Sequence, residues 1–169
     1  MQRYRDLILT EVSAVLERIS DKQTRAFIHE IARAKRIYIT GVGRSGLVVK
    51  AFGQRLMHLG FEVHLADEIT APGAGRGDLL VACSGTGSTL LPLYMARKAR
   101  RVRSRVICLT ADSRSPLARL SKVVVTIPAP LEHGLRTEQP ARSLFEQVLL
   151  LYLDSVILAL IDELEIPLR

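Results

Sequence analysis

The sequence predicts an α/β fold, a three-layer sandwich in which a five-stranded parallel sheet is flanked by helices. Two observations predict it: five short apolar runs rich in β-branched residues, and helical patterns or glycine-rich turns between most of them. Strands that alternate with helices pair in parallel, and the crossover helices then cover both faces of the sheet. At 169 residues, of which 48% are hydrophobic, the chain suits a single domain over residues 1–169 with one continuous core.

Two amphipathic helices are expected before the first strand. Apolar residues recur at helical spacing from Leu7 to Ile19, and they do so again from Phe27 to Ile31. Asp21 stands ahead of the second run, where an N-cap residue belongs. The chain therefore begins with two helices.

The strands follow in a regular alternation. They are expected at residues 36–40, 62–66, 78–83, 106–110 and 123–127. Helices are expected at 47–59, from the end of the Ser84–Thr89 loop through Ala99, near 116–120 and at the end of the chain. The proline-containing stretch after residue 127 has little periodicity over about a dozen residues, so we expect a functional loop there.

The last helix is the most apolar part of the chain. Residues 148–161 include Asp154 and directly follow Glu146 and Gln147, which leaves the run short of the roughly 20 apolar residues that span a bilayer. The first residues of the chain also lack the uninterrupted apolar core of a signal peptide. We therefore expect a buried or subunit-facing helix, no membrane partner and a cytoplasmic protein.

Charge and cysteine content restrict the partners. The net charge of +7 favours anionic partners, and the densest basic run covers residues 97–105. That run falls at the expected C-terminal end of a helix, where cations complement the helix dipole, and only 5% of the residues are aromatic. We expect a solvated helix end there and no nucleic-acid site. Cys83 and Cys108 lie in apolar runs, which is typical of buried free thiols.

The loop Ser84-Gly85-Thr86-Gly87-Ser88-Thr89 is the strongest functional signal in the sequence. It follows an expected strand and precedes an expected helix, at the sheet edge where α/β proteins bind ligands. Its glycines let the backbone approach a ligand, its four hydroxyl groups are neutral donors, and the helix start adds N–H groups and a positive dipole end. These features suit a phosphate monoester, although serine and threonine also serve as ordinary helix N-caps.

A second glycine-rich loop, Gly41-Val42-Gly43-Arg44-Ser45-Gly46, follows the first expected strand. It matches the G-x-G-x-x-G pattern, and Asp67 lies near the end of the next strand, where an acid that binds a ribose belongs. A dinucleotide site is therefore an alternative. The polar pair Arg44-Ser45 and the phosphate-type loop favour a phosphate site instead, because a dinucleotide loop needs little beyond backbone at this point.

Glu146 is the candidate general base. It opens a very apolar helix after the irregular loop, and proton abstraction beside a carbonyl needs a positioned base. The alternative is a first-turn glutamate that stabilises the helix dipole. His133 lies in the irregular loop and is the histidine that we expect to reach a substrate. The sequence has no cluster with metal-ligand spacing, so we expect no metal.

Together these motifs resemble the sugar isomerase (SIS) domain family, and within it the 6-phospho-3-hexuloisomerase branch. The resemblance rests on both loops and on residues 55–61, 68–72 and 144–147, and it runs from residue 5 to residue 162. It implies a phosphosugar isomerase that converts D-arabino-hex-3-ulose 6-phosphate to fructose 6-phosphate through a cis-enediol, in formaldehyde fixation by the ribulose monophosphate route. It also implies that no cofactor is needed, and that the protein is a homo-oligomer, a tetramer or dimer, with active sites near subunit contacts.

The resemblance further implies a role for each candidate residue. Ser45, Ser84, Thr86 and Thr89 would hold the phosphate, Gly85 and Gly87 would shape the loop, and Glu146 would move a proton between C2 and C3. Gly43, Arg44 and Ser88 complete the expected phosphate site, and His133 is the second expected catalytic residue.

The chain departs from the family pattern near this site. The family loop reads S-G-S-G-E-T, so Ser88 stands where relatives have glutamate and the site carries one charge less. Relatives also continue to a tail histidine that reaches a neighbouring subunit's site, whereas this chain stops at Arg169, so that role is either vacant here or filled by another group such as His133. The alternative that fits both departures is a non-catalytic, phosphosugar-binding regulatory SIS module.

Overall fold

The strands and helices of the computed structural model follow the order that the sequence predicts. The structure describes residues 1–131, 137–140 and 142–166. Within that part the elements are α1 (Gln2–Leu16), α2 (Asp21–Ala32), β1 (Ile37–Thr40), α3 (Gly43–His58), β2 (Val63–Leu65), β3 (Leu79–Cys83), α4 (Leu90–Arg101), β4 (Arg105–Thr110), α5 (Pro116–Leu120), β5 (Val123–Thr126) and α6 (Ser143–Glu163). Each end of the five strands lies within one residue of its expected position.

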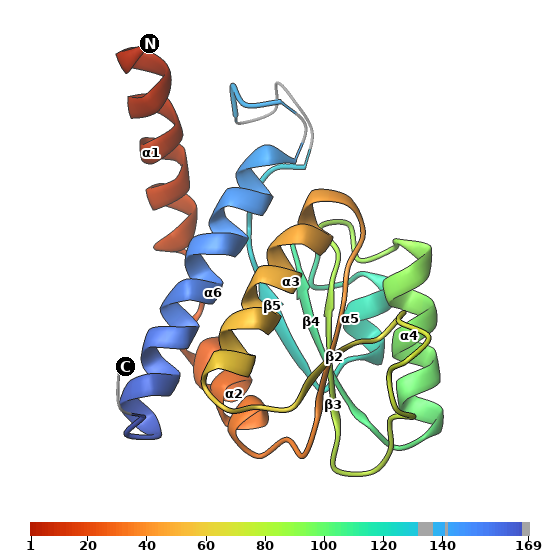
Figure 1. The fold of residues 1–169 in the computed structure, drawn as a ribbon. Coiled ribbons are helices and arrows are strands. Elements are labelled where there is room, and N and C mark those ends of the chain that lie inside the picture. Colours follow the sequence, from red (N-terminus) through yellow and green to blue (C-terminus); the bar gives the residue numbers. More distant parts are fainter. Residues whose placement is uncertain (132–136, 141, 167–169) are drawn as a thin grey trace.

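The strands of the described chain form one parallel sheet in the order β2-β1-β3-β4-β5. Helices α2, α3 and α6 cover one face, and α4 and α5 cover the other (Figure 1). The larger core lies on the first face, where Phe27, Phe52 and Phe145 are fully buried. Coverage of both faces buries every residue of β1 and β3, which is why these strands read as continuous apolar runs. The predicted three-layer α/β sandwich is confirmed.

Helix α3 begins at Gly43, four residues earlier than the sequence predicts. Most of the expected glycine loop is therefore the first turn of a helix. Gly46 explains the difference: a Cβ at this position would lie 2.6 Å from the carbonyl oxygen of Gly41, so the glycine lets α3 start close against the end of β1. The low helix propensity of glycine concealed this start in the sequence.

Helix α6 is long and apolar enough to cross a membrane, by length and composition alone. In the fold it lies between α1 and α3 (Figure 1), and its buried side chains include Phe145, Val148, Tyr152 and Val156. The Tyr152 hydroxyl also forms a 3.2 Å hydrogen bond with Thr24 on α2. Because these side chains form part of the main core, α6 is a core helix of the domain.

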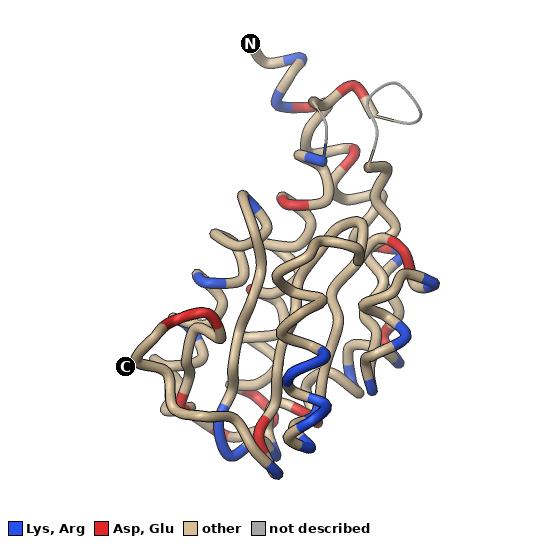
Figure 2. Tube along the Cα trace, turned by 90° about the vertical axis from the view of Figure 1, so that its right-hand side faces the viewer, with Lys and Arg blue, Asp and Glu red and all other residues tan. Residues whose placement is uncertain are grey.

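Both cysteines and most of the basic run lie where the sequence predicts them, but Arg105, the last residue of the run, belongs to β4 and pairs with Glu30 instead of lying at a solvated helix end. Arg97, Arg100 and Arg101 are exposed on the C-terminal half of α4, on the side of the molecule that faces the viewer in Figure 2. Cys83 and Cys108 are free and fully buried. Burial raises the pKa of both thiols, that of Cys108 to about 12, so neither is a reactive thiolate at neutral pH.

A buried ion cluster holds the amino end of the sheet together. Glu30 on α2 accepts hydrogen bonds of 2.7 Å from Arg105 Nη1 and of 2.7 Å from Lys122 Nζ, which ties α2 to β4 and to the start of β5. Burial by itself raises the pKa of Glu30. The Lys122 hydrogen bond and the charges of Arg105, Lys122 and Arg33 outweigh burial and lower the pKa below its ordinary value.

Glu30→Gln tests this cluster. Because folding lowers the pKa of Glu30 from 4.5, the carboxylate stabilises the fold fully above that value and loses its effect as the pH falls through the folded pKa. The variant should lose about 2 kcal/mol of unfolding free energy at pH 7, and the loss should shrink at acidic pH. Urea denaturation across this range measures it, with the exposed substitution Glu163→Gln as control. An equal loss at every pH would contradict the role of the charge.

Candidate functional site

The two predicted loops lie side by side at the centre of the sheet. Strands β1 and β3 are neighbours, with Thr40 paired to Ala82, so the segments that follow them leave the same sheet edge. The chain leaves β1 through α3 toward one face and leaves β3 through α4 toward the other (Figure 1). Ligands of open α/β sheets bind at such a switch point, because the diverging connections leave a crevice outside the strand ends.

The Ser84–Thr89 loop is folded by its own hydroxyl groups. The Ser84 hydroxyl accepts a 3.0 Å hydrogen bond from the Gly87 N–H and shares a 2.8 Å hydrogen bond with Thr89 Oγ1. Thr86 Oγ1 accepts from the Ser88 N–H at 3.3 Å and from Ser88 Oγ at 3.0 Å. Thr89 is the N-cap residue of α4, yet its side chain caps none of the helix N–H groups. The start of α4 thus offers N–H donors to a ligand in the crevice.

Gly85 and Gly87 let this loop pack closely against its surroundings. Gly87 has a φ of +62°, and a Cβ there would lie 2.0 Å from Ser115 Oγ, ahead of α5. A Cβ on Gly85 would lie 3.4 Å from the Phe145 ring on α6. Thr110 at the end of β4 donates to the Gly85 carbonyl oxygen at 3.1 Å. The loop is therefore fixed among β4, α5 and α6.

An ion pair joins the first loop to α6. Arg44, in the first turn of α3, donates from Nε to Oε2 of Glu146, in the first turn of α6. Arg142, just ahead of α6, has a left-handed φ of 68°, which turns the chain into the helix. The ion pair thus joins the buried carboxylate of Glu146 to the segment that follows β1. This contact over 102 residues goes beyond the helix-dipole role that the sequence left open.

The other residues predicted for the site differ in their surroundings. Ser45 is half-buried beside Arg44, and Gly43 has a φ of +61° with open space where a Cβ would lie. Ser88 is exposed in the second loop. His133 lies outside the described residues, so its role stays a prediction.

Glu11 on α1 has a role that the sequence did not indicate. It accepts hydrogen bonds from Thr137 Oγ1 at 2.6 Å, the Glu138 N–H at 3.0 Å and Gln139 Nε2 at 2.9 Å. Burial raises the pKa of Glu11, but these hydrogen bonds outweigh burial and lower it. They tie α1 to the segment that leads into α6 and so to the chain just ahead of Glu146. Its partners lie 126 to 128 residues away, so no local pattern could have revealed them.

Two buried polar atoms near the crevice have no hydrogen-bond partner in the described part of the chain. One is the hydroxyl of Thr40, the last residue of β1, which is 3% exposed, and the other is Oε1 of Gln147, next to Glu146. Buried polar atoms are normally paired. These two are groups that a bound substrate or a water molecule can satisfy.

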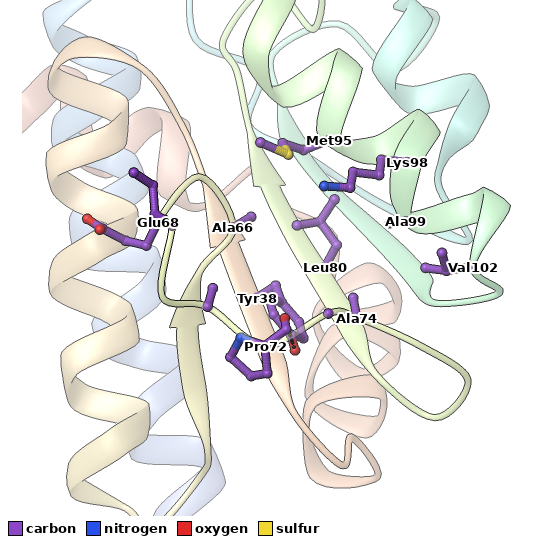
Figure 3. A pocket seen from close by; sticks show the side chains of 13 residues that line it. Tyr38, Ala66, Glu68, Pro72, Ala74, Leu80, Met95, Lys98, Ala99 and Val102 are labelled. Atoms are coloured by element: carbon purple, nitrogen blue, oxygen red, sulfur yellow. Dashed lines mark hydrogen bonds between the residues drawn. The ribbon is translucent and has the colours of Figure 1, made fainter.

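A cavity of about 360 Å³ lies away from the crevice, over the sheet face that α4 covers. The connection between β2 and β3, all of whose residues the structure describes, contains no helix, so irregular chain covers Tyr38 and Leu80 there. Figure 3 shows these two side chains between that connection and Met95 and Lys98 of α4. The lining is mostly apolar and includes none of the residues predicted to bind phosphate.

The two loops supply hydroxyl and N–H donors, and the ion pair adds the guanidinium of Arg44 as a donor and the carboxylate of Glu146 as an acceptor. In residues 1–131, 137–140 and 142–166, no group of three His, Cys, Asp or Glu side chains could hold a metal ion. Hydroxyl and N–H donors suit a phosphate, and a buried carboxylate suits proton transfer.

Comparison with known proteins connects this fold to a family. A family model of the SIS domain matches residues 30–153. The chain is 37% identical over 163 residues to a 3-hexulose-6-phosphate isomerase of Mycobacterium gastri, a match that covers 95% of this chain and 82% of the relative. It is 36% identical over 160 residues to a 3-hexulose-6-phosphate isomerase of Bacillus subtilis, covering 92% and 86%. A Methanococcus jannaschii protein, whose crystal structure was taken to infer the same molecular function, superimposes with a TM-score of 0.85 at 28% identity, covering 98% and 93%.

Comparison of the variants Gly87→Ala and Gly43→Ala distinguishes the effect of a steric clash from that of backbone strain. Both glycines have positive φ, so an alanine at either position is strained. Only at Gly87 would the new Cβ also strike Ser115. Gly43→Ala should therefore lose roughly 1 kcal/mol of unfolding free energy, and Gly87→Ala roughly 3 kcal/mol together with most of the phosphate affinity. Denaturation and calorimetric titration with inorganic phosphate measure both effects; equal losses would mean that the Ser115 contact does not shape the loop.

Proposed function

We propose a function from one premise: this chain belongs to the SIS domain family. Within that family it is a sugar phosphate isomerase that converts D-arabino-hex-3-ulose 6-phosphate to fructose 6-phosphate. Relatives at 36% and 37% identity are 3-hexulose-6-phosphate isomerases, which supports this reaction. The observation that carries the proposal is the Arg44–Glu146 pair, because it joins a buried carboxylate to the first turn of α3, one of the two segments that leave the sheet at the switch point.

The phosphate of the substrate binds between the two loops. Its donors are the N–H groups at the start of α4 and the hydroxyl groups of Ser45, Ser84, Thr86 and Thr89. No acid occurs in the sequence from Ser84 to Thr89, so a phosphate dianion meets no like charge within that loop. Binding at the phosphate end holds C2 and C3 in place, which is the usual use of contacts remote from the reacting atoms.

Glu146 is the general base of the isomerisation. Its carboxylate takes the proton from C2 of the 3-ketose. The electron pair of the broken C2–H bond then forms the C2–C3 double bond of a cis-enediol, and the C3 oxygen gains a proton. The carboxyl group then returns its proton to C3, and the C2 hydroxyl loses a proton as the C2 carbonyl forms. Substrate and product are isomers, so proton transfer alone completes the reaction and no redox cofactor is required.

The chain also has apolar surface that fits a cytoplasmic homo-oligomer, a dimer or tetramer. Leu9 on α1 and Leu151 and Leu158 on α6 are 67%, 46% and 63% exposed. A second copy that covers these side chains would remove apolar surface from water. The free thiols of Cys83 and Cys108 suit a reducing compartment.

Light scattering after size-exclusion chromatography tests the assembly. The expected mass is that of two or four chains, and Leu158→Asp should reduce it, because the substitution places a charge in a surface that becomes buried. A single-chain mass for the unmodified protein would contradict the proposed oligomer.

Glu146→Gln tests the proposed base. The amide keeps the size of the side chain but cannot accept the proton, so turnover should fall by about 10³-fold while fructose 6-phosphate binds no more weakly. A coupled assay of fructose 6-phosphate formation and calorimetric titration measure the two quantities. Glu138→Gln, an exposed substitution just ahead of α6, should leave both unchanged.

Two results would replace the isomerase with another function. Binding of fructose 6-phosphate by the unmodified chain without any turnover would favour the regulatory SIS module. A melting temperature raised by NAD and not by the sugar phosphate would favour the dinucleotide site, because only a ligand of the folded chain stabilises it.

A further inference from the structure

The ion pair between Arg44 and Glu146 is uneven in burial. The Glu146 side chain is 10% exposed, whereas the Arg44 side chain is 64% exposed. Glu146 sits in a turn of α6 that Leu144 and Phe145 anchor in the core, so its carboxylate has little room to move. Arg44 lies on the outer side of α3 with most of its length in water. The cation is therefore the mobile member of the pair.

Little holds the guanidinium where it is. Among the residues that the structure describes, Glu146 is the one acid that pairs with Arg44. Ion pairs with a largely exposed member contribute little to stability, because water and salt screen them and the long side chain loses freedom. A stronger anion near Arg44 can therefore take the guanidinium from Glu146.

Arg44 starts from the same sheet edge as the proposed phosphate position. The first turn of α3 and the Ser84–Thr89 loop follow neighbouring strands, and such strands lie about 4.8 Å apart. A phosphate dianion carries more charge than a carboxylate and matches the planar guanidinium with two parallel hydrogen bonds. It is therefore the better partner.

We propose that Arg44 changes partners when substrate binds. In the free protein it neutralises Glu146. Phosphate bound in the Ser84–Thr89 loop draws the guanidinium away and leaves the carboxylate free to take the proton from C2. The exchange makes the base available only when a phosphate is in place, so a sugar without phosphate leaves the pair closed. The inference rests on the proposed function and assigns Arg44 as the residue that couples the two ends of its site.

A double-mutant cycle measured with inorganic phosphate tests the exchange. The four proteins are the unmodified chain, Glu146→Gln, Arg44→Gln and the double variant. Glu146→Gln releases Arg44, so it should tighten phosphate binding about three- to tenfold when Arg44 is present, and by less than about twofold in the Arg44→Gln background. Calorimetric titration at low ionic strength measures the four dissociation constants. Arg55→Gln, an exposed substitution near the other end of α3, removes the same charge and should leave phosphate binding unchanged.

Each outcome of the cycle decides the matter. Equal tightening in both backgrounds would reflect only the removal of a negative charge, and absence of tightening would mean that the Arg44–Glu146 pair does not compete with phosphate for Arg44. Either result overturns the exchange. The readout does not depend on turnover. If the four proteins show the coupling but the unmodified chain isomerises no sugar phosphate, the exchange is supported and the proposed reaction is contradicted. If the chain isomerises the sugar phosphate but shows no coupling, the reaction is supported and the exchange is contradicted.

Discussion

The parallel pairing of β1 with β3 is the constraint on which the candidate site depends. Because the chain leaves these neighbouring strands toward opposite faces, no crossover fills the space beyond their ends. Helices α3 and α4 both begin there, so two positive dipole ends point at the same crevice. A shift of the register by one residue would turn every side chain of β3 to the other face and remove the loop from its place.

The two ends of the sheet differ in how their polar groups are paired. At the amino end polar groups are fully paired: Glu30 binds Arg105 and Lys122, and Asp78 binds Arg36 at 2.8 Å. At the carboxyl end the loops are rich in hydroxyl groups and the Thr40 hydroxyl lacks a partner in the described chain. Unsatisfied buried groups are costly, so a substrate or a water molecule that pairs with this hydroxyl would stabilise the fold.

The candidate base reaches this edge from a distant part of the chain. Glu146 belongs to α6, whose apolar side chains fill the core against α1, α2 and α3, and that packing determines where its first turn lies. Glu11 on α1 adds a second restraint through Thr137 and Gln139. The position of the carboxylate is therefore set by the main core and not by the loops that surround it. The core therefore holds the candidate base in place, while most of the Arg44 side chain is exposed to water.

Most of the fold and the two loops could be predicted from local sequence. Strands buried on both faces are continuous apolar runs, and phosphate-type loops need small and hydroxylated residues. The residue types within short segments were therefore enough to locate the strands and the two loops in the sequence. Partners far apart in the chain had no such signal: the sequence placed Arg44 in a phosphate loop, and the fold pairs it with a glutamate 102 residues away. The start of α3 was also concealed, because only the close approach of Gly46 to Gly41 makes a helix that opens on glycine favourable. Local patterns record burial and turn geometry, whereas the order of the strands, and with it which loops and charges meet, arises only when the sheet assembles.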